Sequence, residues 1–379
     1  MTDATTPHIY KGLVGVVADE SAVSKVMPET NSLTYRGYPV QDLCDQCSFE
    51  EVTYLLWEGE LPTRKQLNAF RKAEAAERGI SRALTRVIGE FPRKGHPMDT
   101  IRTAVSFMAL EDPDTADISE EATRRKALRL FAKIPTAIAA DYRIRNGMRP
   151  IRPKPELGFS ENMFHMCFGK VPDKRVVKAF DVSMILYAEH GFNASTFAAR
   201  VVASTQADLH SAVVAGISAL KGPLHGGANE AVMHMLKGIG TPAKAKGWID
   251  GRLEDRALVM GFGHRVYKSG DSRVPTMSRY RDIVAEVTGG QKWVEISDIV
   301  AGEMMAKKTI HPNLDFPAGP AYFMMGFPID FFTPLFVASR VTGWAAHVIE
   351  QGRDNRLIRP LSHYVGAAQR DVTRIKDRG

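Results

Sequence analysis

The stretch TPLFVASRVTGWAAHVIEQG, residues 333–352, predicts a long and largely apolar helix near the end of the chain. Thr333 is a candidate N-cap, Pro334 would occupy the first helical position, and Gly352 would end the helix. No proline interrupts the run from 335 to 351, and one glycine lies inside it. Arg340 falls within this run, and a charge on an apolar helix needs a partner or a ligand. The stretch therefore predicts a core helix with a polar site beside it.

Helical patterns dominate the rest of the chain. They cover residues 48–57, 181–204, 207–220, 238–256 and 270–308. The last two are more polar and predict a smaller, more exposed helical region. Near the N-terminus, the β-like runs 13–17 and 33–35, broken by Gly37, predict a small hairpin. We therefore expect a mainly α fold with a small N-terminal β hairpin.

The composition is that of an ordinary soluble globular protein. The chain has 379 residues, of which 44% are hydrophobic and 25% charged, enough for one large domain or two smaller ones. No apolar run reaches the length of a membrane span, and residues 1–12 lack the apolar core of a secretory signal. We expect a cytoplasmic protein with no membrane association.

The formal net charge of +7 has two explanations. It could suit nucleic acid, but the basic residues are spread along the chain and form no Lys/Arg-rich block. A phosphate-bearing, multiply anionic substrate explains the charge equally well. We expect small-molecule substrates and no nucleic-acid partner.

The chain has three cysteines. Cys44 and Cys47 have the C-x-x-C spacing of redox or zinc sites, but no second pair follows and Cys167 stands alone. Two helix positions near Leu43 explain the pair. We expect a reduced protein without disulfides and without a metal site.

Three short segments each place one titratable side chain among glycines or prolines. They are GPLHGGANE (222–230), GFGHRVYK (261–268) and PNLDFPAGP (312–320), which carry His225, His264 and Asp315. Such segments form loops and helix ends, where active sites are usually built. Two histidines and a carboxylate can abstract a proton and activate a carbonyl without a metal.

His225 precedes a helix that should begin near Ala228 or Asn229. The positive potential of a helix N-terminus favours a neutral imidazole, which can donate a hydrogen bond to a carbonyl or enolate oxygen. A structural histidine that caps the helix is the alternative.

His264 follows Gly261-Phe262-Gly263. This is not a dinucleotide fingerprint, because Val266 replaces its third glycine. The peptide N–H groups of such a loop can approach an anion or a purine, and Lys268 adds charge. An ordinary glycine turn is the alternative.

Asp315 lies between Pro312 and Pro317, which predict a stiff, extended loop. A carboxylate held there could serve as a general base, although an aspartate in a turn is common. His190 and Asn193 are predicted to share one helix face.

With these residues assembled, the chain resembles the citrate synthase family over nearly its full length, and within it the bacterial 2-methylcitrate synthases of the actinobacterial type. The resemblance is carried by NSLTYRGYPVQDL (31–43), HPMDTIRTAVS (96–106), SMILYAEHGFNASTFAARV (183–201), ALKGPLHGGANEAVMHML (219–236), GFGHRVYKSGDSRVPTM (261–277), PNLDFPAGPAYFMMG (312–326) and FFTPLFVASRVTGWAAHVIEQ (331–351).

The resemblance implies a homodimer of helical, two-domain subunits. Residues 1–223 and 323–379 would form a large, dimer-forming domain. Residues 224–322 would form a small domain that closes over the active site. No cofactor is implied, because the acyl-CoA is a substrate.

The resemblance also implies the chemistry, a condensation of propionyl-CoA or acetyl-CoA with oxaloacetate followed by thioester hydrolysis. Asp315 would remove the α-proton of the acyl-CoA, His225 would stabilise the enol or enolate, and His264 would polarise the ketone of oxaloacetate. The remaining site residues are implied in the same way: His190, Arg273, Arg340 and a partner's Arg359 would hold oxaloacetate, while Val259, Met260, Gly261, Phe262, Gly263 and Lys268 would meet CoA.

Several alternatives stay open at this point. A citrate synthase of the tricarboxylic acid cycle is one, and the preference between the two acyl groups is undecided because a methylene is worth only about 1–3 kcal/mol in a pocket. A non-catalytic basic binding protein on the same scaffold is another, although His225, His264 and Asp315 are all present. A lyase running the reverse reaction is the third.

Overall fold

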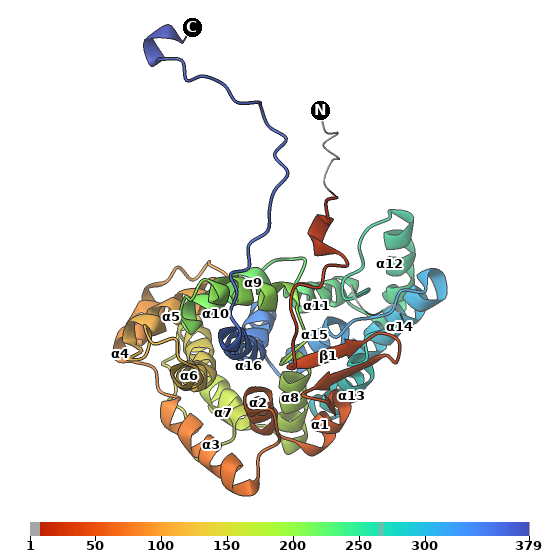
Figure 1. The fold of residues 1–379 in the computed structure, drawn as a ribbon. Coiled ribbons are helices and arrows are strands. Elements are labelled where there is room, and N and C mark those ends of the chain that lie inside the picture. The colour runs from red at the N-terminus through yellow and green to blue at the C-terminus, as the bar shows by residue number, and fades with distance from the viewer. Residues whose placement is uncertain (1–7, 265–266, 268, 379) are drawn as a thin grey trace.

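The structure, a computed structural model, describes residues 8–264, 267 and 269–378. These residues form sixteen α-helices and one small sheet (Figure 1), so the predicted mainly α fold is confirmed. The helices are α1 (Val40–Gln46), α2 (Phe49–Glu58), α3 (Arg64–Glu77), α4 (Arg82–Glu90), α5 (Pro97–Glu111), α6 (Glu120–Arg145), α7 (Phe159–Phe168), α8 (Lys174–Tyr187), α9 (Ala194–Ser204), α10 (Leu209–Leu220), α11 (Ala228–Ile239), α12 (Pro242–Glu254), α13 (Val274–Thr288), α14 (Gln291–Lys308), α15 (Asp315–Met324) and α16 (Phe332–Arg353).

The predicted long helix is α16, and it forms the centre of the molecule (Figure 1). Every residue from 332 to 349 is buried, and the helix packs against α2, α6, α8, α9 and α10. A helix surrounded on all sides can be apolar all round. Its predicted ends were wrong: the helix begins one residue before Thr333 and continues to Arg353. Thr333 lies inside the first turn, after the N-cap Phe331, and the Glu230 carboxylate of α11 accepts hydrogen bonds from its N–H and its hydroxyl.

The predicted helix 181–204 is broken into α8 and α9 by a turn at residues 188–193. Asn193 caps α9, since its side-chain oxygen accepts the N–H groups of Ser195 and Thr196, both at 3.1 Å. The turn lies against Gly343 of α16. A Cβ atom at Gly343 would collide with the Ala188 carbonyl oxygen and the Glu189 carboxylate, so only glycine permits this approach.

The small sheet has three antiparallel strands, β1 (Ser24–Met27), β2 (Ser32–Tyr35) and β3 (Tyr38–Pro39). The predicted strand at 33–35 is confirmed, but the partner predicted at 13–17 was wrong. That segment begins in a 3-10 turn and is exposed, with Val17 90% accessible. The Tyr35 hydroxyl donates to the Ile185 carbonyl oxygen at 3.0 Å and to that of Glu189 at 2.9 Å, which fastens the sheet to the end of α8.

Helices α11 to α15 pack mainly on one another, with α13 also resting on α8 and α11 on α16. This set matches most of the predicted small domain, 224–322; the division itself stays a prediction. After α16, the chain leaves the helical body as an extended C-terminal segment (Figure 1). Its apolar side chains Leu361, Tyr364 and Val365 are each at least 75% exposed.

None of the described helices combines the length and the apolarity that crossing a bilayer would need. Cys44, Cys47 and Cys167 are free thiols. Among the described residues, no three His, Cys, Asp or Glu side chains are grouped so that they could hold a metal ion.

Candidate active site

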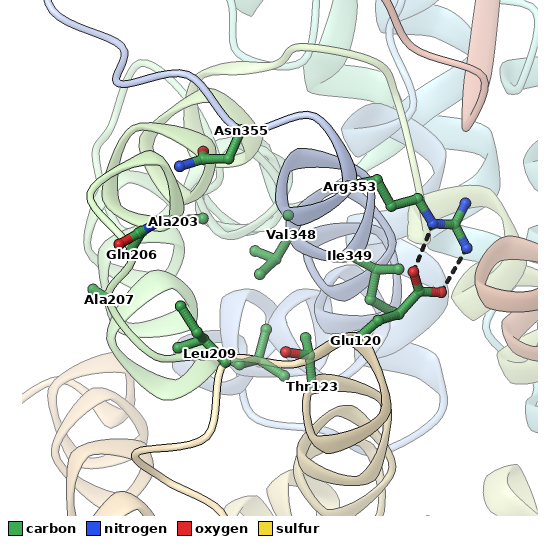
Figure 2. A pocket seen from close by; sticks show the side chains of 12 residues that line it. Glu120, Thr123, Ala203, Gln206, Ala207, Leu209, Val348, Ile349, Arg353 and Asn355 are labelled. Carbon is green, nitrogen blue, oxygen red and sulfur yellow. Dashed lines mark hydrogen bonds and ion pairs between the residues drawn. The ribbon is translucent and has the colours of Figure 1, made fainter.

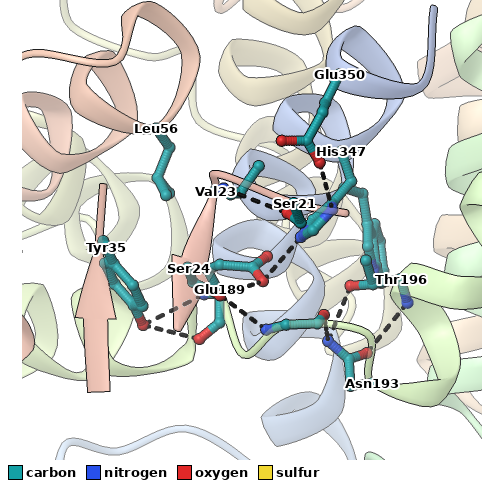
Figure 3. A network of polar contacts seen from close by, with 12 residues as sticks. Ser21, Val23, Ser24, Tyr35, Leu56, Glu189, Asn193, Thr196, His347 and Glu350 are labelled. Atoms are coloured by element: carbon teal, nitrogen blue, oxygen red, sulfur yellow. Dashed lines mark hydrogen bonds and ion pairs between the residues drawn. The ribbon is translucent and has the colours of Figure 1, made fainter. Parts of the chain in front are cut away.

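The turn between α8 and α9 carries Glu189 and His190, so His190 and Asn193 do not share a helix face as predicted. Figure 3 shows the polar network around Glu189. One Glu189 oxygen accepts hydrogen bonds from the Ser24 hydroxyl at 3.0 Å and from His347 Nε2 at 2.9 Å. Burial raises the pKa of Glu189, but His347 and Arg340 outweigh it and lower the pKa overall. The turn therefore holds a buried anion, Glu189, immediately before His190.

Arg340 projects from α16 and is 2% exposed. Its Nε donates to the Tyr187 carbonyl oxygen at 2.6 Å, and its guanidinium carbon lies 4.7 Å above the Phe336 ring. Burial lowers the pKa of Arg340 to about 10, which leaves it charged at neutral pH. Within the described part of the chain, neither its Nη1 nor Nε2 of the buried His190 has a hydrogen-bond partner. An unpaired buried guanidinium donor of this kind calls for an anionic ligand, and the unpaired imidazole nitrogen adds a second polar group that needs a partner.

His225 lies in the loop before α11, whose predicted start at Ala228 is confirmed. The Ser195 peptide N–H, an obligate donor, lies 3.3 Å from His225 Nε2, and the Ser195 hydroxyl lies 2.9 Å from the same atom. Nε2 therefore accepts, which places the ring proton on Nδ1. Burial, helped by Arg340, lowers the pKa of His225 to about 4. The ring is thus neutral at pH 7 and can donate from Nδ1.

His264 faces His190, with ring centroids 5.1 Å apart. Its Nδ1 accepts the Tyr267 peptide N–H at 3.1 Å, so the proton of the neutral ring is on Nε2. Burial and then Arg273 lower the pKa of His264 to about 4, although Asp271 opposes them. His264 is therefore a second neutral donor.

Arg273 is buried one residue before α13. Asp271 binds it through two contacts, 2.9 Å to Nε and 2.7 Å to Nη2. Burial lowers the pKa of Arg273, but the charge of Asp271 outweighs this effect and raises it overall. The guanidinium is held rigidly beside His264.

Asp315 is the first residue of α15, so the predicted extended loop was wrong. Pro317 is compatible with this helix because the first N–H groups of a helix have no intrahelical partner. The Tyr187 hydroxyl donates to one Asp315 oxygen at 2.6 Å. Burial raises the pKa of Asp315 to about 6, with the Tyr187 bond and Arg273 acting in the opposite direction. The carboxylate is thus largely ionised at pH 7, and its proton affinity suits a general base.

These side chains converge although they come from five separate parts of the chain. The Phe336 ring lies 4.2 Å from the Tyr187 ring and 6.5 Å from the His225 ring. Electrostatic coupling links the other members, because Arg273 acts on His190, His264 and Asp315 alike. Six of the seven predicted catalytic and oxaloacetate residues therefore meet: His190, His225, His264, Arg273, Asp315 and Arg340. The seventh, Arg359, is exposed on the extended C-terminal segment.

The predicted CoA loop, 259–263, lies beside this cluster. Gly261 adopts φ +82°, and a Cβ atom there would lie 2.6 Å from Val232 and 2.9 Å from Phe316. The Gly263 N–H already donates to the His311 carbonyl oxygen at 2.8 Å, so it is not open to an anion. Val259 is buried, Met260 and Phe262 are partly buried, and Lys268 lies outside the described residues.

Sequence reasoning missed Tyr187, Ser195 and Asp271. Tyr187 and Asp271 contact predicted site residues through their side chains, and Ser195 sets the tautomer of His225. A polar side chain at the end of an apolar helix was the available signal for Tyr187. Proximity in sequence was the signal for Asp271, which stands two residues before Arg273.

A separate hollow lies at the C-terminal end of α16, away from Arg340. It is bounded by the start of α6 and the turn from α9 to α10 (Figure 2). Val348 and Leu209 line it, and an Arg353–Glu120 ion pair of 2.6 Å closes one side. None of the predicted site residues lines this hollow.

The fold and the sequence both have known counterparts. The family profile described as "Citrate synthase, C-terminal domain" matches residues 12–361. The chain is 57% identical to a citrate synthase of Mycolicibacterium smegmatis over 98% of this chain and 99% of the relative. It is also 57% identical to a 2-methylcitrate synthase of Mycobacterium tuberculosis, strain Erdman, over 96% of this chain and 92% of the relative.

The fold is also similar to that of a solved citrate synthase structure. The citrate synthase of Thermoplasma acidophilum, in a ternary complex with carboxymethyl coenzyme A and oxaloacetate, superimposes with a TM-score of 0.93. The two sequences are 32% identical, and the match covers 98% of this chain and all of the other.

Proposed function

Because this chain belongs to the citrate synthase family, we propose that it is an acyltransferase that condenses an acyl-CoA with oxaloacetate and then hydrolyses the thioester. The observation that carries this proposal is the buried, unpartnered guanidinium nitrogen of Arg340, whose charge acts on Asp315. Among the residues that the structure describes, Arg340 Nη1 and His190 Nε2 have no hydrogen-bond partner. A carboxylate of oxaloacetate supplies the acceptor that the Arg340 donor needs.

Asp315 acts as the base. One of its oxygens is held by Tyr187, so the other is presented to the substrate and takes the α-proton of the acyl-CoA. The electrons of that C–H bond move into an enol or enolate whose oxygen accepts a hydrogen bond from His225 Nδ1. A neutral imidazole suits this task, because its proton affinity lies closer to that of an enolate than an imidazolium's does.

The new carbon–carbon bond forms between this nucleophile and the ketone carbon of oxaloacetate. Arg273, Arg340, His190 and Arg359 from a second copy of the chain hold the oxaloacetate carboxylates. His264 donates from Nε2 to the ketone oxygen, which becomes a hydroxyl group as the bond forms. Water then cleaves the thioester and releases CoA and a tricarboxylate.

The remaining assignments follow the same proposal. The loop 259–263 and Lys268 receive CoA, and the exposed Leu258 beside this loop offers apolar surface to an adenine. No cofactor takes part. Residues 224–322 close over the bound oxaloacetate, and the protein works in the cytoplasm.

A homodimer is part of the proposal because Arg359 must come from another copy. Arg359 lies on the extended segment that leaves the helical body, and the apolar side chains on that segment are exposed. Packing them on a second subunit would remove this apolar surface from water.

For the acyl group we propose propionyl-CoA as a good substrate and acetyl-CoA as a usable one, which makes the enzyme a 2-methylcitrate synthase with citrate synthase activity. Tyr322 and Phe323 follow Asp315 on the same helix, α15, and are therefore candidates for shaping the acyl site. Tyr322 instead donates to Ser183 at 3.0 Å and Phe323 packs on Trp293. Tyr187, in contact with the base, is better placed.

The test is kcat/KM for acetyl-, propionyl- and butyryl-CoA at saturating oxaloacetate. We expect butyryl-CoA to be slowest, because a packed pocket resists added volume. A propionyl-CoA value more than about tenfold below that for acetyl-CoA, a discrimination that a pocket closed to the extra methylene can produce, would leave citrate synthase as the function. Absence of turnover with all three would favour the non-catalytic alternative.

A further inference from the structure

Asp271 links two residues of the proposed site that lie far apart in sequence. Its side chain is fully buried, and both oxygens are occupied. Oδ1 accepts hydrogen bonds from Nε and the peptide N–H of Arg273, at 2.9 and 3.1 Å. Oδ2 accepts from Nη2 of Arg273 at 2.7 Å and from the Leu314 peptide N–H at 3.1 Å. One carboxylate thus holds an arginine and the residue immediately before Asp315.

The two chain segments are joined at further points. Asn313 donates its peptide N–H to the Gly261 carbonyl oxygen at 2.9 Å and its side-chain Nδ2 to that of Gly263 at 3.0 Å. Its side-chain oxygen accepts the Asp315 N–H at 3.1 Å. The loop that presents His264 and the helix start that presents Asp315 therefore form one hydrogen-bonded unit. Asp271 connects Arg273 to this unit through an ion pair.

We propose that Asp271 is a positioning residue that couples oxaloacetate binding at Arg273 to the placement of the base Asp315. The inference rests on the proposed function, because it takes oxaloacetate as the ligand of Arg273. A substrate carboxylate can approach Arg273 only at the donors that Asp271 leaves open. Any movement of the guanidinium is then transmitted to the Leu314 amide through the shared carboxylate, because all four contacts are to the same rigid group.

Asp271 also balances charge. Arg273 stabilises the ionised form of Asp315, and Asp271 opposes that effect. Removing the negative charge while keeping a hydrogen-bonding side chain should therefore lower the pH at which Asp315 loses its proton. A residue that only supports folding would not move this value.

The test compares Asp271→Asn with Asp141→Asn. Asp141 is a matched control, since it is 2% exposed and accepts Arg145 Nε at 2.9 and 2.8 Å. We expect Asp271→Asn to weaken oxaloacetate binding at least about tenfold and to lower kcat by about 10–10²-fold, as for a misplaced catalytic group. The acidic limb of kcat should move down by about one pH unit. Asp141→Asn should change none of the three.

Hydrogen exchange gives a readout that does not depend on turnover. In the wild-type protein, oxaloacetate should slow exchange in the peptide that contains Leu314 and Asp315, and this protection should be lost in Asp271→Asn. If that variant cannot be isolated folded, Asp271→Glu carries the test. Its charge is retained, so the acidic limb should stay in place, but the added methylene should still lower kcat and the protection.

The possible results separate this inference from the proposed function. Wild-type protein that binds no oxaloacetate would overturn both. Active wild-type protein together with Asp271 variants that match Asp141→Asn in oxaloacetate affinity, kcat and pH profile would overturn the positioning role alone.

Discussion

The hydrogen bond from Tyr187 to Asp315 leads to a sharp prediction about pH. The Tyr187 hydroxyl donates to the carboxylate at 2.6 Å, and this bond favours the ionised form of the base. Tyr187→Phe removes the hydroxyl and keeps the ring that packs on Phe336. The pKa of Asp315, about 6 in the native protein, must then rise.

The size of the rise follows from the bond. A hydrogen bond to a charged group is worth about 1.5–3 kcal/mol, and one pKa unit corresponds to about 1.4 kcal/mol. The pKa should therefore rise by about 1–2 units, to roughly 7–8. The ionised fraction at pH 7 falls from about nine-tenths to between a half and a tenth, so kcat there should fall about two- to tenfold. Activity should recover toward pH 9, where the carboxylate is ionised in both proteins.

The assay is the pH profile of kcat at saturating oxaloacetate and acyl-CoA. Activity needs the ionised base, so the wild-type rate should fall as the pH drops through about 6. Tyr322→Phe is the control, because its ring lies 6.4 Å from the Tyr187 ring but its hydroxyl donates to Ser183. An acidic limb that stays in place or moves to lower pH in Tyr187→Phe would refute this account of the base.

Three further predictions concern the site and the core. Asp315→Asn should lower kcat by roughly 10²–10⁴, the range for a lost general base, with the fold intact by circular dichroism; near-native turnover would remove Asp315 from its role. Arg340→Leu should raise the Kd for oxaloacetate far more than that for acyl-CoA, and mixing it with Arg359→Leu protein should create heterodimers with one intact site. Verified heterodimers without recovered activity would count against a shared site. Gly216→Ala would place a Cβ atom 2.9 Å from the Trp344 ring, and it should lower the free energy of unfolding by about 1–3 kcal/mol through overpacking; an unchanged denaturation midpoint would contradict that packing.

Local sequence patterns predicted the helical core well and the ends of its elements poorly. The run at 335–351 was recognisable because it is largely apolar and no proline interrupts it. Its start was misplaced because Glu230, about a hundred residues earlier, accepts the Thr333 N–H in place of a local side-chain cap. The strand partner at 13–17 failed for a related reason, since strand pairing depends on contacts that composition does not record.

The residues of the candidate active site were likewise predicted only in part. Glycine- and proline-rich segments drew attention to His225, His264 and Asp315, because loops and helix ends are where such side chains reach a ligand. The local backbone at Asp315 was wrong, since prolines are tolerated in the first turn of a helix. Tyr187 went unrecognised because its partner is 128 residues away. Only the folded chain brings the hydroxyl and the carboxylate together.

The central claim is that Asp315 starts an oxaloacetate-dependent condensation of an acyl-CoA. The most direct measurement is the release of free CoA thiol from propionyl-CoA, with and without oxaloacetate, together with the mass of the product. We expect release only when oxaloacetate is present, formation of 2-methylcitrate in equal amount, and loss of both in Asp315→Asn. Thiol release that ignores oxaloacetate, or that continues unchanged in Asp315→Asn, would contradict the claim.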